Sequence, residues 1–122
     1  YNSTWIAKRN SVIATIPAGY YEGIDRRLSN KGHVYVNATG TDTNLSHQFK
    51  CPIIGRVSMN ITSIDITDAV SLAEKDGLEI ALGSKVVILG PDFNARDVGN
   101  MCETIPYEIL VHIQDQLKRI YI

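Results

Sequence analysis

The tyrosines and arginines of this sequence, among them Tyr1, Tyr20, Tyr107, Arg26 and Arg56, are side chains whose types allow chemistry. A phenol can exchange a proton near neutral pH when positive charge lies close to it, and a guanidinium attracts carboxylates. No segment that holds these residues is a self-sufficient catalytic signature. Residue chemistry alone therefore indicates a soluble, β-rich domain and stops there.

The other reactive side chains form no pattern that indicates a metal site or a disulfide. His33, His47 and His112 lack metal-ligand spacing and are predicted to be ordinary surface or half-buried histidines. Cys51 and Cys102 lie far apart in the sequence and match no CxxC or zinc motif. Both are predicted to be reduced thiols, as is usual in the cytosol.

The length and the net charge of the chain limit the classes of protein to which it can belong. A chain of 122 residues can form one domain with its own core. A net charge of −1, with basic residues scattered along the chain, argues against a nucleic-acid partner. No apolar run approaches the roughly 20 residues of a membrane helix, and no signal-peptide pattern is present. Because the sequence begins at Tyr1 as if within an element, we expect a domain of a longer protein.

Short β-branched runs bounded by glycine, proline, asparagine or aspartate predict strands. The run over 52–59 is nearly continuous, so we expect it to be buried on both faces. Apolar residues alternate with polar ones over 62–67, as in a half-buried strand. The predicted strands cover 11–16, 33–37, 52–59, 62–67, 85–89 and, at the end of the chain, 120–122.

Helical signals are confined to the C-terminal third of the chain. Asp92 or Asn94 is a candidate N-cap for a short helix that continues through Met101. Pro106 suits the first turn of a second helix, whose apolar face would be formed by Ile109, Leu110, Ile113 and Leu117. Glu103 and Glu108 are expected to be carboxylates near the start of this helix.

Two segments between these elements carry no periodic pattern. The polar stretch 39–48 predicts a surface loop, and 72–83 predicts a mixed connection. The predicted fold is therefore mainly β, barrel-like or two-sheeted, with one or two short helices.

Four motifs occur in this chain in the order in which alanine racemases carry them. Residues 16–23, IPAGYYEG, resemble the family's IPxGYADG segment, and residues 26–30, RRLSN, resemble its RxLSN. Residues 51–59, CPIIGRVSM, resemble CPIVGRVSMD, and residues 103–110, ETIPYEIL, resemble GTINYEIL. Together they span nearly the whole chain, which thus resembles the C-terminal domain of the alanine racemase family.

The resemblance implies that residues 1–122 are the β-barrel-like C-terminal domain of a bacterial isomerase that uses pyridoxal 5'-phosphate (PLP). The family's N-terminal PLP-binding barrel is absent from this sequence. No lysine here lies in a segment that resembles the family's PLP-carrying lysine motif, so no covalently held PLP is expected in this chain. In the family's homodimer, the barrel of one subunit meets this domain of the other, and each active site is shared.

The resemblance makes Tyr1 the catalytic tyrosine, because residues 1–5, YNSTW, resemble the family's VSYGxTW/Y segment. Racemisation removes the α-proton from one face of the amino acid and returns a proton to the other. The two bases implied are the barrel lysine and this tyrosine, on opposite faces. Since a phenol is a weak base at neutral pH, cations are expected near Tyr1.

Further roles follow from the same resemblance. Residues that correspond to the family's substrate-access corridor are Tyr20, Arg26, Arg56 and Ile105. Met59 corresponds to the position whose backbone N–H holds the substrate carboxylate. Tyr107 corresponds to a tyrosine that hydrogen-bonds the PLP phosphate and helps to form the inner gate.

The sequence departs from the family pattern at a few places. Glu22 stands where the family has aspartate, which keeps the charge and lengthens its reach. Asn60 replaces the aspartate that usually follows the methionine, which removes a charge and keeps one hydrogen-bonding oxygen. We expect this change to affect rate or substrate preference more than fold. The 39–48 segment is longer than the family's usual turn, as in a tolerated insertion that could touch the dimer partner.

Three hypotheses about function remain open. In the first, the parent protein interconverts L- and D-alanine in the cytoplasm and supplies D-alanine for peptidoglycan. In the second it is a serine or broad-specificity racemase, motivated by Asn60; some serine racemases are tethered to a membrane. Tyr107 favours alanine, because serine racemases of this kind tend to carry asparagine there. In the third, the chain is a non-catalytic dimerisation or regulatory module. The isolated chain is expected to be inactive with added PLP.

Overall fold

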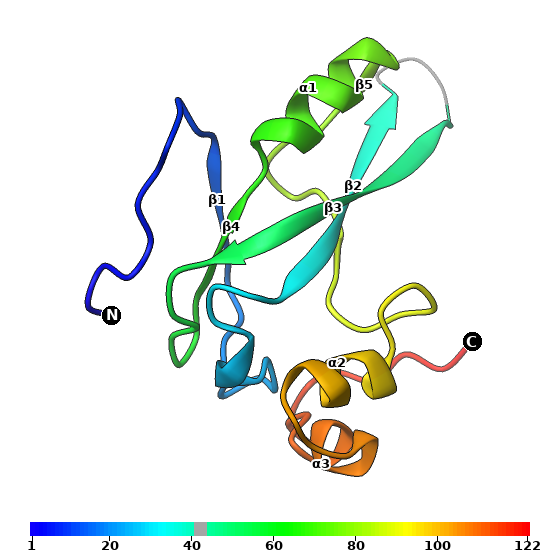
Figure 1. Ribbon diagram of the computed structural model, residues 1–122. Coiled ribbons are helices and arrows are strands. Elements are labelled where there is room, and N and C mark those ends of the chain that lie inside the picture. The colour runs from blue at the N-terminus through cyan, green and yellow to red at the C-terminus, as the bar shows by residue number, and fades with distance from the viewer. Residues whose placement is uncertain (41–43) are drawn as a thin grey trace.

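The computed structural model describes residues 1–40 and 44–122 (Figure 1). Within them, six strands form one antiparallel sheet of order β1-β4-β3-β2-β5, and β6 also pairs with β2. The strands are β1 (Ile13–Ile16), β2 (His33–Gly40), β3 (Ser46–Ile54), β4 (Thr62–Asp65), β5 (Leu78–Glu79) and β6 (Val86–Val87).

β2 and β3 form a long hairpin at the centre of the sheet (Figure 1). In its register Val34 faces Cys51 and Val36 faces Phe49, and all four side chains are buried. The two strands still pair at positions 39 and 46, so the prediction of a surface loop over 39–48 was wrong for residues 39–40 and 46–48. Residues 41–43 of that segment lie outside the described residues.

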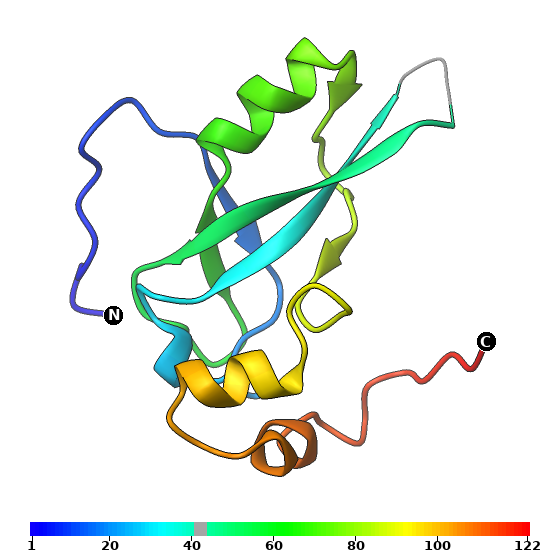
Figure 2. The same ribbon diagram turned by 45° about the vertical axis from the view of Figure 1, so that its right-hand side comes forward.

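β3 changes partners along its length, and this change curls the sheet. Most of β3 pairs with β2, whereas its last residues, Ile53 and Ile54, pair with β4. β4 then pairs with β1 along the whole of both strands. The strands curl into half a barrel, as Figures 1 and 2 show from two sides. The prediction of a mainly β, barrel-like fold is confirmed.

The predicted strands differ in their bounds from those in the structure; β6, for example, covers only Val86–Val87 of the predicted 85–89. Two of them differ further. The strand over 52–59 ends early because β3 stops at Ile54 and Gly55 turns the chain with a φ of 67°. Val57 is buried but Arg56 and Met59 are exposed, so the prediction of burial on both faces was wrong there. Residues 120–122 form no strand and are exposed.

Three α-helices and one turn of 3₁₀ helix lie within the described residues, against one or two predicted. They are η1 (Arg26–Leu28), α1 (Thr67–Lys75), α2 (Ala95–Met101) and α3 (Pro106–Val111). Helices were predicted only in the C-terminal third of the chain, and α1 shows that this was wrong. α1 also covers the start of the segment 72–83, which was predicted to be a mixed connection. None of these helices has the length and apolar content needed to cross a membrane.

The two C-terminal helices begin where the sequence predicts. The Asn94 side chain caps α2 by accepting from the N–H groups of Arg96 and Asp97, and Asp97 bonds back to the Asn94 N–H. α3 begins at Pro106 but ends at Val111, so the predicted helical positions Ile113 and Leu117 lie beyond it. The two helices pack at the opposite end of the sheet from α1 (Figure 2).

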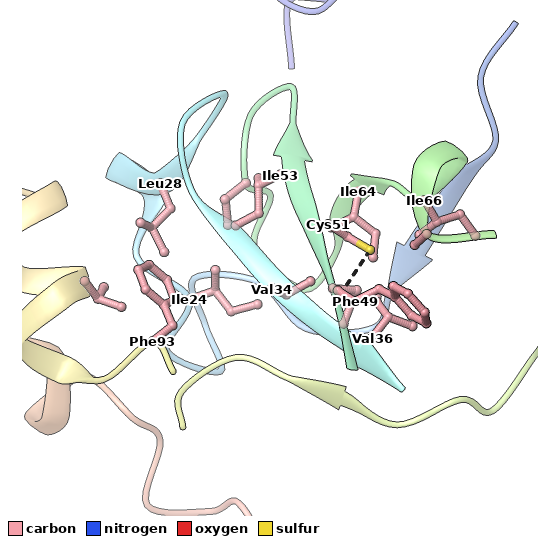
Figure 3. Packing of buried hydrophobic residues seen from close by; sticks show 14 of the residues in the cluster. Ile24, Leu28, Val34, Val36, Phe49, Cys51, Ile53, Ile64, Ile66 and Phe93 are labelled. Atoms are coloured by element: carbon pink, nitrogen blue, oxygen red, sulfur yellow. Dashed lines mark hydrogen bonds between the residues drawn. The ribbon is translucent and has the colours of Figure 1, made fainter. Parts of the chain in front are cut away.

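The core lies between the curled sheet, η1 and α2 (Figure 3). Residues from separate parts of the chain meet there; those labelled in Figure 3 are Ile24, Leu28, Val34, Val36, Phe49, Cys51, Ile53, Ile64, Ile66 and Phe93. Cys51 and Cys102 are free and buried, in agreement with the predicted thiols. Burial raises the pKa of the Cys51 thiol to about 11.

Candidate functional site

The RRLSN and CPIIGRVSM motifs are joined by hydrogen bonds that hold two loops together. The Asn30 side-chain oxygen accepts from the Gly55 N–H at 2.7 Å, and the Asn30 N–H donates to the Gly55 carbonyl at 3.1 Å. Next to it, the Ser29 hydroxyl accepts from the Val57 N–H at 2.9 Å. These bonds fix the turn that follows Arg26 against the loop that carries residue 56.

Tyr1 lies beside this pair of loops. The Arg26 guanidinium carbon is 5.8 Å from the centre of the Tyr1 ring, a cation–π distance. The Asn30 amide donates to the Thr4 hydroxyl at 2.9 Å and so ties the N-terminal segment to the same turn. Within the described residues, neither Arg26 nor Arg56 forms an ion pair, so both guanidiniums are available to an anion.

The turn around Gly19 lies directly on the loop that contains Met59. The Tyr20 N–H donates to the Ser58 carbonyl at 3.0 Å, and the Tyr21 N–H donates to the Met59 carbonyl at 2.9 Å. A side chain at Gly19 would start only 2.0 Å from the Ser58 oxygen and 2.6 Å from the Met59 oxygen. This close approach of two backbones is why only glycine fits at position 19.

Glu22 joins the same two segments through its carboxylate. One oxygen accepts from the Gly19 N–H at 2.7 Å, and the other accepts from the Asn60 amide at 2.9 Å. The Gly19 bond and then the Asn60 bond lower the pKa of the Glu22 carboxyl. Asn60 makes this contact through its NH₂ group, a donor that the aspartate usual at this position lacks.

Met59 keeps a free hydrogen-bond donor at this point. Its carbonyl is engaged by Tyr21, but its N–H donates to no acceptor among the described residues. Its side chain is 49% exposed. A backbone N–H that is unpaired in a fixed loop can bind a carboxylate oxygen without any contribution from the side chain.

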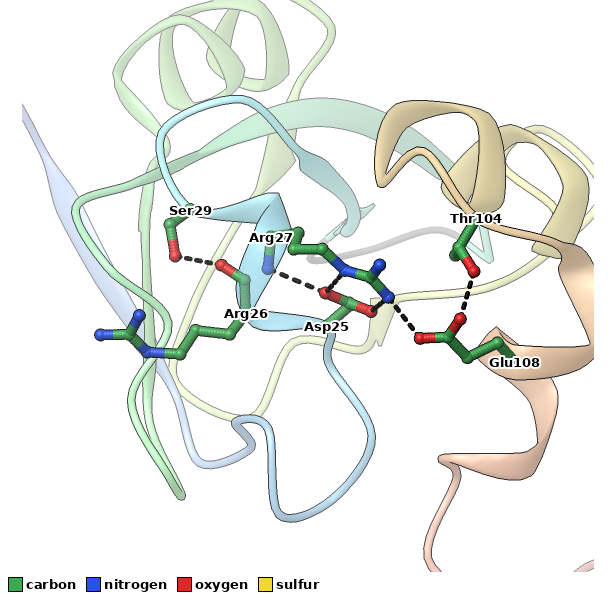
Figure 4. Close-up of polar contacts among 6 residues, drawn as sticks. All are labelled: Asp25, Arg26, Arg27, Ser29, Thr104 and Glu108. Carbon is green, nitrogen blue, oxygen red and sulfur yellow. Dashed lines mark hydrogen bonds and ion pairs between the residues drawn. The ribbon is translucent and has the colours of Figure 1, made fainter.

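An ion-pair network joins η1 to α3 (Figure 4). Asp25 caps η1 and binds the Arg27 guanidinium through both oxygens, at 2.9 and 2.8 Å. The same guanidinium donates to Glu108 at 2.7 Å, and the Thr104 hydroxyl donates to the other Glu108 oxygen. Arg27 thus joins the turn that carries Arg26 to α3, which contains the second half of the ETIPYEIL motif.

The network changes the proton affinities of its members. Hydrogen bonds from the Arg27 side chain hold the pKa of the Asp25 carboxyl below its usual range. The Thr104 hydroxyl, and then Arg27, lower the pKa of Glu108. Hydrogen bonds to these two carboxylates raise the pKa of Arg27 further. All three groups are therefore charged at neutral pH.

His112 brings a third metal-binding residue type to this network. Ligand atoms of Asp25, Glu108 and His112 lie within 4.8 Å of one another. Glu108 and His112 lie four residues apart on α3 and at its C-cap, whereas Asp25 precedes η1, so sequence spacing reveals only part of the group. The Arg27 guanidinium already bonds both carboxylates, and a metal ion would have to replace it. His33 is half-buried, and His47 and His112 are exposed. All three therefore match the prediction of surface or half-buried histidines.

The residues predicted to form the site are exposed and border the surface. Exposed fractions are 63% for Tyr1, 41% for Tyr20, 60% for Ile105 and 75% for Tyr107. Tyr20 and Arg26 line the same pocket of about 570 Å³. Ile105 is the N-cap residue of α3 and Tyr107 lies in its first turn. The arrangement is an open surface that a second body can cover.

The structure links the predicted residues to different degrees. Arg26 contacts Tyr1, and Tyr20 is tied to the loop of Met59. Ile105 and Tyr107 are linked to the others indirectly, through the ion pairs that join their helix to η1. Sequence reasoning missed Arg27 and the position of Glu108 between Thr104 and Arg27. The Asp25-x-Arg27 and Thr104-x₃-Glu108 spacings are the signals that could have indicated them.

Comparison with known proteins identifies the family. The family model "Alanine racemase, C-terminal domain" matches residues 1–121. The chain is 38% identical to alanine racemase of Rickettsia akari over 122 residues, which is 100% of this chain and 30% of the relative's length. It is similar to the crystal structure of alanine racemase from Bartonella henselae with covalently bound pyridoxal phosphate, with a TM-score of 0.72 and 34% identity over 100% of this chain and 29% of that one.

A second crystal structure, of the biosynthetic alanine racemase from Pseudomonas aeruginosa, matches with a TM-score of 0.77 and 28% identity. The match covers 99% of this chain and 29% of that chain. The chain therefore spans about a third of the length of the proteins that it resembles. Nearly the whole chain matches one part of each of them. The chain belongs to the alanine racemase C-terminal domain family.

Proposed function

We propose that this chain is the C-terminal domain of a PLP-dependent racemase that interconverts L- and D-alanine. The observation that carries the proposal is the contact between the exposed Tyr1 and Arg26, which forms no ion pair within the described residues. The free N–H of Met59 lies on the loop that is bonded to the Tyr20 turn. A proton-transfer group, an anion-binding cation and a carboxylate donor are the parts that such a half-site requires. The parent protein would supply D-alanine for peptidoglycan in the bacterial cytoplasm.

Tyr1 would move the proton on one face of the amino acid. Its phenolic oxygen takes or returns the α-proton, and the Arg26 guanidinium over the ring supplies a positive charge next to it. Arg26 is suited to this role because no carboxylate of the described residues neutralises it, unlike its neighbour Arg27. A second base on the opposite face would come from the barrel of the other subunit.

The substrate carboxylate would be held by the Met59 N–H and guided by two cations. The Met59 loop is fixed through its carbonyl, which accepts from Tyr21, so the N–H points from a rigid backbone. Arg56 is exposed and follows Gly55, whose N–H and carbonyl are both hydrogen-bonded to Asn30. Exposed guanidiniums that form no ion pair within the described residues attract the carboxylate of an approaching amino acid.

The exposed residues of α3 and the Gly19 turn would face the cofactor and the access corridor. The Tyr107 phenol is a hydrogen-bond donor on an exposed helix turn, which fits a phosphate oxygen of PLP. When bound, PLP withdraws electrons from the α-carbon and makes its proton removable. Tyr20 and Ile105 would narrow the corridor. PLP itself would be carried by the barrel.

A second subunit would complete the site. α3 and the residue before it expose an apolar surface to solvent, formed by Ile105, Tyr107, Leu110 and Val111. An exposed apolar surface of this kind is typical of a contact with another protein surface, here the barrel of a partner subunit. The isolated chain would then lack the lysine base and the cofactor, and would be inactive with added PLP.

The substrate preference is tested by measuring racemisation rates on L-alanine and L-serine. We expect the parent protein with PLP to racemise L-alanine with a kcat/KM at least roughly tenfold above that for L-serine, since Tyr107 leaves little room for a hydroxymethyl group. Tyr107→Asn should shift the ratio toward serine, and Tyr121→Asn, in the exposed C-terminal tail, should not. A wild-type preference for serine would assign a serine racemase. Inactivity on both would leave a dimerisation or regulatory module.

A further inference from the structure

Glu22 and Asn60, two positions at which this sequence departs from the racemase motifs, are bonded to each other. The Asn60 NH₂ donates to the Glu22 carboxylate at 2.9 Å. The motifs carry aspartate at both positions. In this chain an aspartate at position 60 would face the Glu22 carboxylate, and two adjacent carboxylates repel each other. Here one residue supplies the negative charge and the other supplies the donor. The two departures therefore form a single complementary contact.

This contact closes a ring between two segments that hold proposed substrate-binding residues. The second Glu22 oxygen accepts from the Gly19 N–H, at the start of the turn that carries Tyr20. Two backbone bonds, to the carbonyls of Ser58 and Met59, already join that turn to the neighbouring loop. The Glu22–Asn60 bond adds the side-chain link at the far end of the loop. The turn and the loop are thus held at three successive points.

Because Asn60 is uncharged, it adds no negative charge next to the Met59 N–H. Glu22 carries one negative charge, which two N–H donors partly compensate. An aspartate at position 60 would add a second negative charge immediately after the residue that is proposed to bind the substrate carboxylate. It would also remove the donor that holds the loop.

We infer that Glu22 and Asn60 are a positioning pair, which fixes the Met59 N–H relative to Tyr20 and keeps its surroundings favourable to a carboxylate. The inference rests on the proposed racemase function. Neither residue needs to touch the substrate; both act through the position and the charge of the Met59 loop.

The test is a charge exchange within the pair in the full-length parent protein. Asn60→Asp should raise the KM for alanine about threefold to tenfold, as expected for a partly exposed hydrogen bond to a charged group. The kcat should change by less than about twofold, because Tyr1 is not moved. Glu22→Gln combined with Asn60→Asp should restore the KM, since the new side-chain amide can accept from the Gly19 N–H and donate to the new carboxylate.

A matched control and a second readout separate this inference from the proposed function. Asn10→Asp, at an exposed position before β1, should leave KM unchanged. Hydrogen exchange at the Tyr20 and Tyr21 amides should be faster in Asn60→Asp and return to normal in the double variant, with or without turnover. An unchanged KM and exchange rate in Asn60→Asp, or a double variant no better than the single one, would overturn the pairing. A wild type inactive on alanine would overturn the proposed function and the positioning role, while exchange still tests the contact.

Discussion

Arg26 and Arg27 are adjacent in the sequence and have opposite roles in the structure. Arg27 is held by Asp25 and Glu108, while Arg26 remains unpaired within the described residues and lies over the Tyr1 ring. The sequence predicted Arg26 as a site residue through family resemblance alone. The reason for the difference, the position of Glu108, is a tertiary contact across 81 positions that no local pattern contains.

At the residue scale, Gly19 is the position where the smallest change should do the most damage. Gly19→Ala would push a methyl group into two backbone carbonyls that have no room to move. We expect the free energy of unfolding to fall by about 2–3 kcal/mol, the cost of overpacking a well-packed site. Urea denaturation of the full-length parent measures this loss.

Gly77→Ala is the matched control for this variant. Gly77 has a φ of 69° and nothing within 4 Å of an added Cβ, so only the strained backbone is affected. Its expected cost is about 1 kcal/mol. If the two variants lost equal stability, the close approach of the turn to the Met59 loop would not be what requires glycine at position 19.

At the element scale, the sequence predicted the elements that have a clear capping residue, a proline in the first turn or regularly spaced apolar residues. The α2 cap at Asn94, the α3 start at Pro106 and the alternation in β4 are visible in the sequence and present in the structure. α1 was missed because its buried face consists of Ala69 and Ala73 and no side chain caps its start. The outer part of the β2–β3 hairpin was missed because a strand pair that leaves the core carries exposed polar residues, like a loop.

The attachment of α3 to η1 should depend on pH through Asp25 and Glu108. Both folded-state pKa values are lowered, so the carboxylates add stability above their unfolded values near 4. That stability is lost as the pH falls through the lower folded values. We expect the Tm of the parent to drop as the pH is lowered from about 5 toward 3.

Glu108→Gln should make this acid-induced drop shallower, because one of the two titrating groups is gone and α3 is less firmly held at pH 7. Hydrogen exchange in α3 should be faster at neutral pH in this variant. Glu74→Gln, an exposed carboxylate of α1, serves as the control and should leave both readouts unchanged. An acid profile identical in Glu108→Gln and wild type would show that the bridge does not hold the helix.

At the scale of the whole molecule, the chain forms a folded core and one open face. The core comes from residues spread over the chain between Ile16 and Ile109. The exposed groups include Tyr1 in contact with Arg26, the free Met59 N–H, and residues of α3 that ion pairs of Arg27 join to the Arg26 turn. This exposed surface supports the proposal of an active site that is completed by a second subunit.

The sequence could identify the candidate residues of this face but not the bonds that connect them. Motif order predicted Tyr20, Arg56 and Met59 together. The Glu22–Asn60 bond joins residues 38 positions apart and the Asn30–Gly55 bond joins residues 25 apart. Such contacts depend on how β3 and the turn after Gly19 meet in three dimensions, which composition and periodicity do not encode.

The most direct test of the account is proton exchange by Tyr1→Phe in the full-length parent with PLP bound. If Tyr1 is one of two bases, the variant should lose nearly all racemisation and keep its PLP absorbance, while Tyr121→Phe behaves as wild type. In D₂O, exchange of the α-proton should continue with one enantiomer of alanine, through the remaining base, and stop with the other. Racemisation at the wild-type rate, or equal exchange of both enantiomers, would contradict the assignment of Tyr1.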